Sequence, residues 1–195
     1  QLGNPANYND SIWDDFLNQL TPTELKRLVE DGGYGSRAAE SIGKPVNLEY
    51  DGPSGFNRTN LSPNTPGSNM TALPCENLTG QTWNKELLSQ AGQIIGMDGQ
   101  NFGISGIYAP GVNLHREALN GRNYEYYSED GVLSGYLAAS FIKGAASNGV
   151  YSYIKHLALY DSSPWTNQRV WCTEQNLREN YLKPFEIAIK KGGAN

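Results

Sequence analysis

The sequence of 195 residues has little cysteine, little histidine and no excess of positive charge. Cys75 and Cys172 form no Cys-x-x-Cys pair and no His cluster accompanies them, which argues against a disulfide scaffold and a structural zinc site. Fifteen Lys and Arg residues against 20 Asp and Glu give a net charge of -5, which repels a phosphate backbone. We therefore expect no metal, no other cofactor and no nucleic-acid partner.

Long apolar runs and several common catalytic motifs are also missing. Without an apolar run of membrane length, we expect no membrane association. The polar residues 1–9 lack the basic-then-apolar order of a signal peptide, and the cellular compartment stays open. The sequence has no G-x-S-x-G, no G-x-x-x-x-G-K-[ST] and no H-E-x-x-H, so readings as a serine hydrolase of that type, a nucleotide-binding protein or a metallohydrolase lack support.

Aromatic and small polar residues are what the sequence has in quantity. Aromatic residues make up 11% of the chain, 12 of them tyrosines, and there are 22 glycines. Tyrosine and tryptophan offer a flat apolar face together with a polar edge. This composition favours a neutral, hydrogen-bonding ligand over an ionic one.

Two helices are predicted ahead of the first strand. Residues 10–20 carry an apolar stripe with helical spacing, which we expect to be packed. The next helix begins with the capping residue Thr21, has Pro22 at its first position and has Glu24 three residues after the cap. It is predicted to end at the glycines 32 and 33.

Strands and helices then alternate along the chain. The patterns predict strands near residues 45–50, 71–75, 104–114 and 150–159, the last buried on both faces, and helices capped by Asn84 and Thr173 and over 132–141. Residues 57–69 read as a long exposed loop. The glycines at 96, 99 and 103 are predicted to end the Asn84 helix, and Pro184 to kink or interrupt the last one.

This alternation predicts an α/β fold with parallel strands, either an open sheet or a closed barrel. A (β/α)8 barrel has eight such units and about 250 residues. We therefore predict the first half of a TIM-type (β/α)8 barrel. Residues 1–195 would form a single partial domain of about four βα units, and the remainder of the protein's own chain would complete the barrel.

Functional groups of such folds gather at the carboxyl ends of the strands. Any charged residue at such a position also has a plain structural alternative, because loop charges commonly pair with one another or face water. Asp130 or Ser128 is predicted to cap the following helix instead. The polar candidates at the strand ends are Asp51, Glu76, His115, Arg116, Glu117, Arg122, Glu125, Lys155, His156 and Asp161.

Lys155 and His156 are the most informative pair, because they follow an otherwise apolar strand. Side chains alternate along a strand, so only one of the two is expected to face a barrel mouth unless the strand has ended or bulged. The alternative is one core histidine and one surface lysine.

Several segments together carry a family resemblance. They read DGP at 51–53, YAPGVNLHR at 108–116, GRNYEYYSED at 121–130, KH at 155–156, LRE at 177–179 and YLKPFE at 181–186. In order and spacing they resemble the amino-terminal barrel domain of family 3 glycoside hydrolases, the β-glucosidase family. The resemblance covers nearly the whole chain from about residue 20.

The resemblance implies a retaining exo-β-glycosidase that hydrolyses terminal nonreducing β-linked sugars of an oligosaccharide or β-glucoside. Asp51 would bind sugar hydroxyls far from the scissile bond, and Arg122, Lys155 and His156 would contact the same sugar. By the resemblance, both side chains of the Lys-His pair face the ligand.

The resemblance also leaves the catalysis outside this chain. The family's nucleophilic Asp and its acid/base follow on later segments, beyond residue 195, so no catalytic residue is expected here. Tyr160 stands where the family commonly has Asn, while Asp161 still aligns. A non-catalytic carbohydrate-binding or scaffolding protein derived from this fold remains the alternative.

Overall fold

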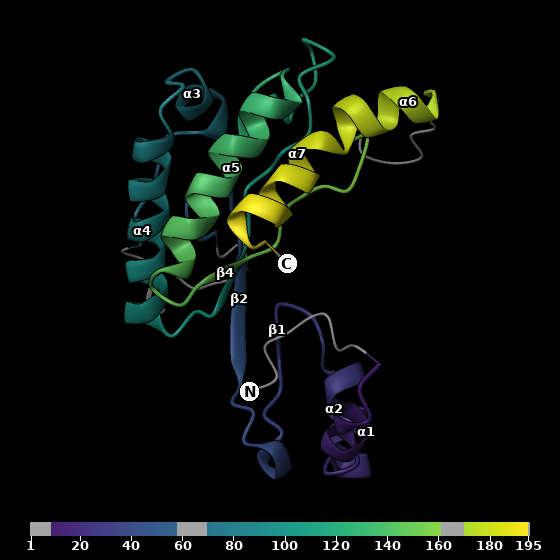
Figure 1. Ribbon diagram of the computed structural model, residues 1–195. Helices are drawn as coiled ribbons and strands as arrows, with labels where there is room; N and C mark the ends of the chain where they lie inside the picture. Colours follow the sequence, from purple (N-terminus) through teal and green to yellow (C-terminus); the bar gives the residue numbers. More distant parts are fainter. Residues whose placement is uncertain (1–8, 58–69, 161–169, 195) are drawn as a thin grey trace. The chain divides into compact units, whose positions relative to one another are not determined.

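The computed structural model describes residues 9–57, 70–160 and 170–194 (Figure 1). The chain divides into two compact units, Gln1–Leu48 and Glu49–Asn195. The predicted loop at 57–69 lies almost wholly outside the described residues, and so does Asp161.

The first unit is small and helical at its start. It contains α1 (Ile12–Leu17), α2 (Pro22–Glu30), β1 (Gly35–Ser36) and a 3-10 turn (Glu40–Ile42). The predicted cap is confirmed: the Thr21 hydroxyl accepts the Glu24 N–H at 3.2 Å, and the Glu24 carboxylate accepts the Thr21 N–H at 2.8 Å. The expectation that residues 10–20 are packed holds only in part: Leu20 is buried and Trp13 and Phe16 are half-buried, but none of the 6 residues of α1 is fully buried.

Short strands form a mixed sheet. β1 pairs antiparallel with the first residues of β2 (Asn47–Asp51). In the second unit, β2 pairs in parallel with β3 (Gly106–Tyr108), and β3 pairs in parallel with β4 (Tyr151–Ser152). Parallel strands joined through helices confirm the predicted α/β class.

Helices separate these strands and follow them. They are α3 (Glu76–Gly80), α4 (Lys85–Phe102), a 3-10 turn (Asn123–Glu125), α5 (Gly131–Ala146), and the C-terminal series α6 (Glu174–Asn176), η4 (Leu177–Tyr181), α7 (Lys183–Ile187) and η5 (Ala188–Gly192). The predicted caps Asn84, Asp130 and Thr173 each accept a backbone N–H of their helix. Pro184 does interrupt the last helix, since it sits at the start of a new α-helical turn.

The strand predicted at residues 71–75 is wrong, because these residues have no regular secondary structure. Pro74 has no N–H to donate, and Leu73 instead donates its N–H to the Ser54 carbonyl at 2.9 Å. The predicted strands 104–114 and 150–159 are each much shorter than expected, although an isolated bridge pairs Gly111 with Lys155 beyond them.

The two faces of the parallel strands have different chemistry. Tyr50, Ile107 and Ile154 pack with the hydrophobic core that the helices cover. Because side chains alternate along a strand, Glu49, Asp51 and Tyr108 point to the opposite face. The expectation that residues 150–159 are buried on both faces therefore holds only in part: Val150 and Ser152 are buried, but Tyr151 and Tyr153 are half-buried.

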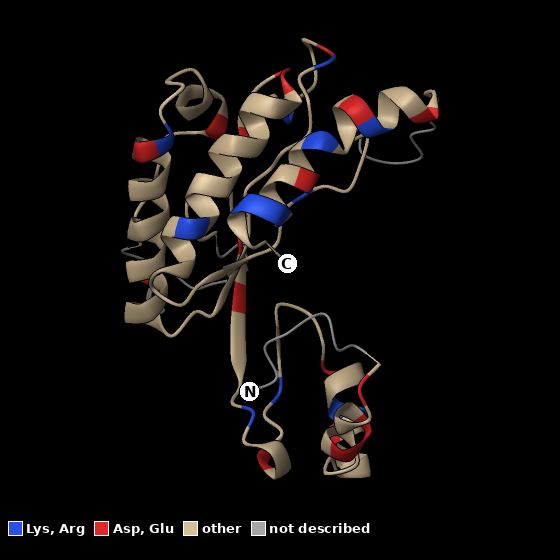
Figure 2. Ribbon diagram, in the orientation of Figure 1, with Lys and Arg blue, Asp and Glu red and all other residues tan. Residues whose placement is uncertain are grey.

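The hydrophobic core is covered by α4 and α5. These two helices lie side by side and are nearly uncharged along their lengths (Figures 1 and 2). A Cβ on Gly92 of α4 would collide with the Phe141 carbonyl oxygen, and one on Gly144 of α5 with the Ser89 carbonyl oxygen. The glycines predicted to end α4 at 96 and 99 lie inside it instead, because they too permit close contact, and only Gly103 ends the helix, at φ 70.

Candidate functional site

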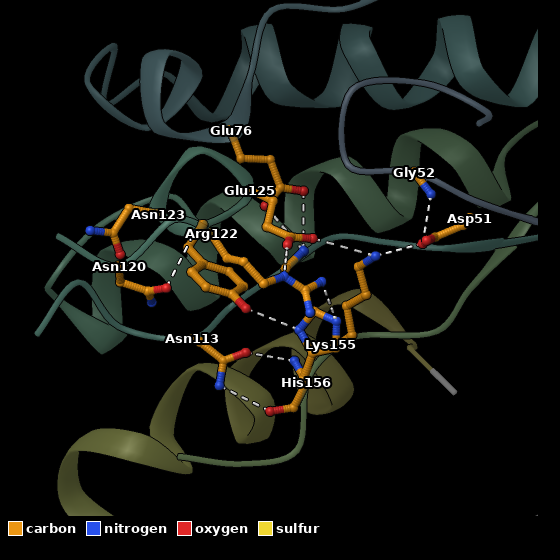
Figure 3. Close-up of polar contacts among 12 residues, drawn as sticks. Asp51, Gly52, Glu76, Asn113, Asn120, Arg122, Asn123, Glu125, Lys155 and His156 are labelled. Carbon is orange, nitrogen blue, oxygen red and sulfur yellow. Dashed lines mark hydrogen bonds and ion pairs between the residues drawn. The ribbon is translucent and has the colours of Figure 1, made fainter. Parts of the chain in front are cut away.

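Polar side chains from three strand ends meet at one place in the second unit (Figure 3). Asp51 ends β2, Lys155 and His156 follow β4, and the loop after β3 supplies Arg122 and Glu125. In this parallel sheet the three chain segments leave at the same edge, which explains the convergence.

Lys155 lies between two carboxylates. Its Nζ is 2.5 Å from Asp51 Oδ1 and 3.5 Å from Glu125 Oε2. The Lys155 side chain is 12% exposed and that of Glu125 is 2% exposed, whereas Asp51 is 42% exposed. Asp51 is therefore the carboxylate of this pair that a ligand can reach.

Arg122 pairs with Glu125 in the same loop. Its Nε donates to Glu125 Oε1, and its guanidinium lies 5.1 Å from the centre of the Tyr160 ring. Burial alone lowers the pKa of Arg122, but the hydrogen bond and charge of Glu125 outweigh it and raise that pKa above its ordinary value. Arg122 is a fixed cation with a planar set of donors.

His156 is held in one neutral form. Burial first, and then the charges of Arg122 and Lys155, lower the pKa of His156 to about 4. Arg122 Nη2 lies 3.0 Å from His156 Nε2 and can only donate, so Nε2 accepts. The proton of the neutral ring is therefore on Nδ1, which donates to the Tyr126 hydroxyl 3.1 Å away.

Glu76 approaches the cluster from the N-terminus of α3 but is turned to the backbone. Both of its carboxylate oxygens accept the Gly111 N–H, at 3.1 and 3.0 Å, and the residue is 3% exposed. Burial raises the pKa of Glu76 well above its usual value, against the lowering effect of the Gly111 N–H and of Lys155. Glu76 therefore contacts the backbone of the loop after β3 rather than facing a ligand.

Both members of the Lys-His pair reach the cluster. Alternation continues to Lys155, which forms an isolated bridge with Gly111 and reaches the same face as Tyr151 and Tyr153, and it fails only at His156, which follows that bridge. Asn113 holds the His156 backbone from both sides: its Oδ1 accepts the His156 N–H at 2.6 Å and its Nδ2 donates to the His156 carbonyl at 2.9 Å. Sequence reasoning did not single out Asn113 or Tyr126, although both stand in the quoted motifs.

Three other candidates do not belong to the cluster. His115 Nε2 lies 3.0 and 2.8 Å from the carbonyl oxygens of Asn123 and Tyr126, so it shapes the loop. Arg116 donates to the Glu129 carbonyl at 3.2 Å, and Glu117 is exposed. Charge type and position relative to a strand could not separate these residues from Arg122 and Glu125.

The ion pairs of the cluster contain two cations and two carboxylates. Lys155 and Arg122 face Asp51 and Glu125, and the His156 ring is neutral. An additional ion would upset this balance, whereas a polyhydroxylated neutral molecule can exchange hydrogen bonds with the cluster.

Within residues 9–57, 70–160 and 170–194, no group of three or more His, Cys, Asp or Glu side chains is placed to hold a metal ion. None of the helices described is long and apolar enough to cross a membrane.

Fold and site together define an α/β barrel-type domain with a polar, charge-balanced site at the strand ends. Residues 36–195 match the profile described as the glycosyl hydrolase family 3 N terminal domain. The chain belongs to glycosyl hydrolase family 3, and its fold is the (β/α)-barrel type of that family, as the sequence predicted.

Curated relatives are β-glucosidases. The chain is 36% identical to a β-glucosidase of Rhizobium radiobacter over 182 residues, which are 92% of this chain and 22% of the relative. It is 38% identical to β-glucosidase B of Emericella nidulans over 179 residues, 90% of this chain and 21% of the relative. The chain thus spans about a fifth of the length of these relatives.

Solved structures give the same result. β-Glucosidase 3B of Thermotoga neapolitana, in complex with α-D-glucose, superposes with a TM-score of 0.79 at 37% identity, over 92% of this chain and 28% of that one. A β-glucosidase of Kluyveromyces marxianus superposes with a TM-score of 0.82 at 28% identity, over 93% of this chain and 22% of that one.

Proposed function

We propose that the chain is the sugar-binding part of a retaining exo-β-glycosidase of the β-glucosidase type, and that Asp51, Arg122, Lys155 and His156 bind the terminal nonreducing sugar. The cluster of these four residues around Lys155 is the observation that carries the proposal. It combines a half-exposed carboxylate, a fixed guanidinium and a neutral imidazole, which suit vicinal hydroxyl groups.

Asp51 is the centre of this recognition. The side-chain oxygen Oδ1 of Asp51 accepts from Lys155 Nζ at 2.5 Å and from the Gly52 N–H at 2.9 Å. Two sugar hydroxyls would donate to the exposed part of the carboxylate, while Lys155 keeps that carboxylate oriented. Bonds of this kind to a part of the substrate away from the reacting centre help to position that centre.

The catalytic carboxyl groups, in this proposal, are not among the described residues. Retaining hydrolysis needs two carboxyl groups roughly 5 to 5.5 Å apart across the scissile bond, one of them nucleophilic. Glu125 is bound to Arg122, Glu76 is bound to the Gly111 N–H, and Asp51 is assigned to remote hydroxyls. The nucleophile and the acid/base would come from the remainder of the protein's own chain, which with residues 1–195 completes the domain.

Asp51→Ala tests the proposal in the full-length protein, with 4-nitrophenyl β-D-glucoside as substrate. Loss of two charge-assisted hydrogen bonds should lower kcat/KM about 100-fold, from ~3 kcal/mol of lost transition-state binding. The melting temperature should change little, because Lys155 keeps Glu125 as a partner. Glu117→Ala, an exposed carboxylate of the neighbouring loop, is the control.

Two results would contradict the proposal. Near-parental kcat/KM in Asp51→Ala would make Asp51 a structural turn residue. A parent protein that binds glucose in a calorimeter but hydrolyses no β-glycoside would instead be the non-catalytic carbohydrate-binding protein.

A further inference from the structure

A second carboxylate lies on the same strand face as Asp51, two residues earlier. Glu49 is 7% exposed. Three tyrosine hydroxyls donate to it: Tyr108 to Oε2 at 2.6 Å, and Tyr151 and Tyr153 to Oε1 at 2.6 and 3.1 Å. A buried carboxylate is stable only with such donors, and here all three come from other strands or their ends.

The hydrogen bonds from Tyr151 and Tyr153 join β2 to a segment that is not its neighbour in the sheet. β2, which carries Glu49, and β4, which carries Tyr151, both pair with β3 and not with each other. The Asp51–Lys155 ion pair crosses β3 in the same way. Two side-chain links therefore connect β2 with β4 and the residues after it, and the Glu49 link lies directly beside the Asp51 link.

The regular backbone pairing between β3 and β4 is short, and a single isolated bridge, Gly111↔Lys155, lies beyond it. The β3–β4 register contains two residue pairs, Gly106↔Tyr151 and Ile107↔Ser152. The three tyrosine rings add rigidity, because Tyr108 stacks on Tyr153 with centroids 5.0 Å apart and Tyr151 meets Tyr153 edge-on at 5.5 Å. The ring contacts therefore hold the three hydroxyl groups in place to donate hydrogen bonds to Glu49.

We propose that Glu49 is a positioning residue, which through its three tyrosines sets the spacing of Asp51 and Lys155 for sugar binding. The proposal rests on the proposed function, because it takes Asp51 and Lys155 as sugar-binding residues. Glu49 itself touches no sugar: it fixes β2 against the segment that leads from Tyr153 to Lys155.

Glu49→Gln in the full-length protein is the decisive variant, since it removes the charge and nearly keeps the shape. KM for 4-nitrophenyl β-D-glucoside should rise about tenfold, the effect of weakening hydrogen bonds to one charged group. In an Asp51→Asn background the same change should alter KM less than twofold, because residues that act through one another are not additive. Tyr151→Phe, which leaves two donors, is the milder variant, with the exposed Tyr136→Phe as its control.

Amide exchange gives a readout that needs no activity. The N–H groups of Tyr153 and Lys155 donate to the carbonyls of Ile107 and Pro110 at 2.9 and 3.1 Å. Glu49→Gln should speed exchange at these two amides at least tenfold and leave the amides in the middle of α4 unchanged.

The outcomes separate the two proposals. An unchanged KM in Glu49→Gln, or effects of Glu49→Gln and Asp51→Asn that multiply, would overturn the positioning role. If the parent hydrolyses no β-glycoside, the proposed function fails, and the exchange rates alone decide whether Glu49 fixes the Asp51–Lys155 segment. Equal exchange in parent and variant would then refute it.

Discussion

Replacing Glu125 with glutamine should destabilise the protein more than any exposed carboxylate replacement. Its side chain is 2% exposed, binds Arg122 Nε and lies 3.5 Å from Lys155 Nζ. Glu125→Gln keeps the volume but leaves two cations without their shared buried partner.

The size of the effect follows from exposure. Removing one partner of a buried ion pair costs about 3–5 kcal/mol. Arg122 is 26% exposed, so water screens part of its charge, and the glutamine amide oxygen can still accept from Nε. We expect a loss of about 2–3 kcal/mol, which is below the middle of that range because Arg122 is partly exposed and the glutamine oxygen still accepts one hydrogen bond.

The decrease in the free energy of unfolding is measured by urea unfolding of the full-length protein, in the transition that includes this domain. Glu117→Gln is the matched control, because Glu117 is exposed in the same loop, and it should stay within about 0.5 kcal/mol of the parent. A Glu125→Gln protein as stable as Glu117→Gln would refute the idea that Glu125 is the shared counter-ion.

Two further predictions concern pH and packing. Because burial and then Arg122 lower the pKa of His156 to about 4, below the usual 6.5, its stabilising contribution is complete above pH 6.5 and is lost as the pH falls through 4. The stability difference between the parent and His156→Gln should accordingly shrink from pH 7 to pH 4, and a constant difference would contradict the neutral ring. Gly92→Ala should cost about 1–3 kcal/mol in thermal unfolding, because its Cβ meets the Phe141 carbonyl, whereas Gly32→Ala, whose Cβ has its nearest neighbour at 3.8 Å, should be neutral or stabilising.

The features of the fold that could be predicted are those that depend on a few neighbouring residues. Thr21, Asn84, Asp130 and Thr173 were recognisable as caps because capping depends on one side chain and the next three residues. The strand at 71–75 and the early end of α4 were predicted wrongly because they depend on distant partners. An apolar run becomes a strand only where another strand accepts its hydrogen bonds, and a helix glycine can serve packing as well as termination.

The candidate site was predictable as a group and less so in its details. The α/β pattern already implied that Asp51, Lys155 and His156 come together, because parallel strands end at one edge. The direction of His156 was not predictable from the strand period, since it depends on strand pairing ending at Lys155. The Glu49 cluster was not anticipated, because its three tyrosines come from positions 59, 102 and 104 residues away.

The two-sided hold of Asn113 on the His156 backbone also has a thermodynamic consequence. Past the end of β4, this amide gives the segment the donor and acceptor that a neighbouring strand would otherwise provide. The backbone of His156 is therefore ordered when the protein folds, and a ligand does not have to order it on arrival. The entropy cost of recognition then falls mainly on the ligand's own freedom, so affinity can come from few contacts.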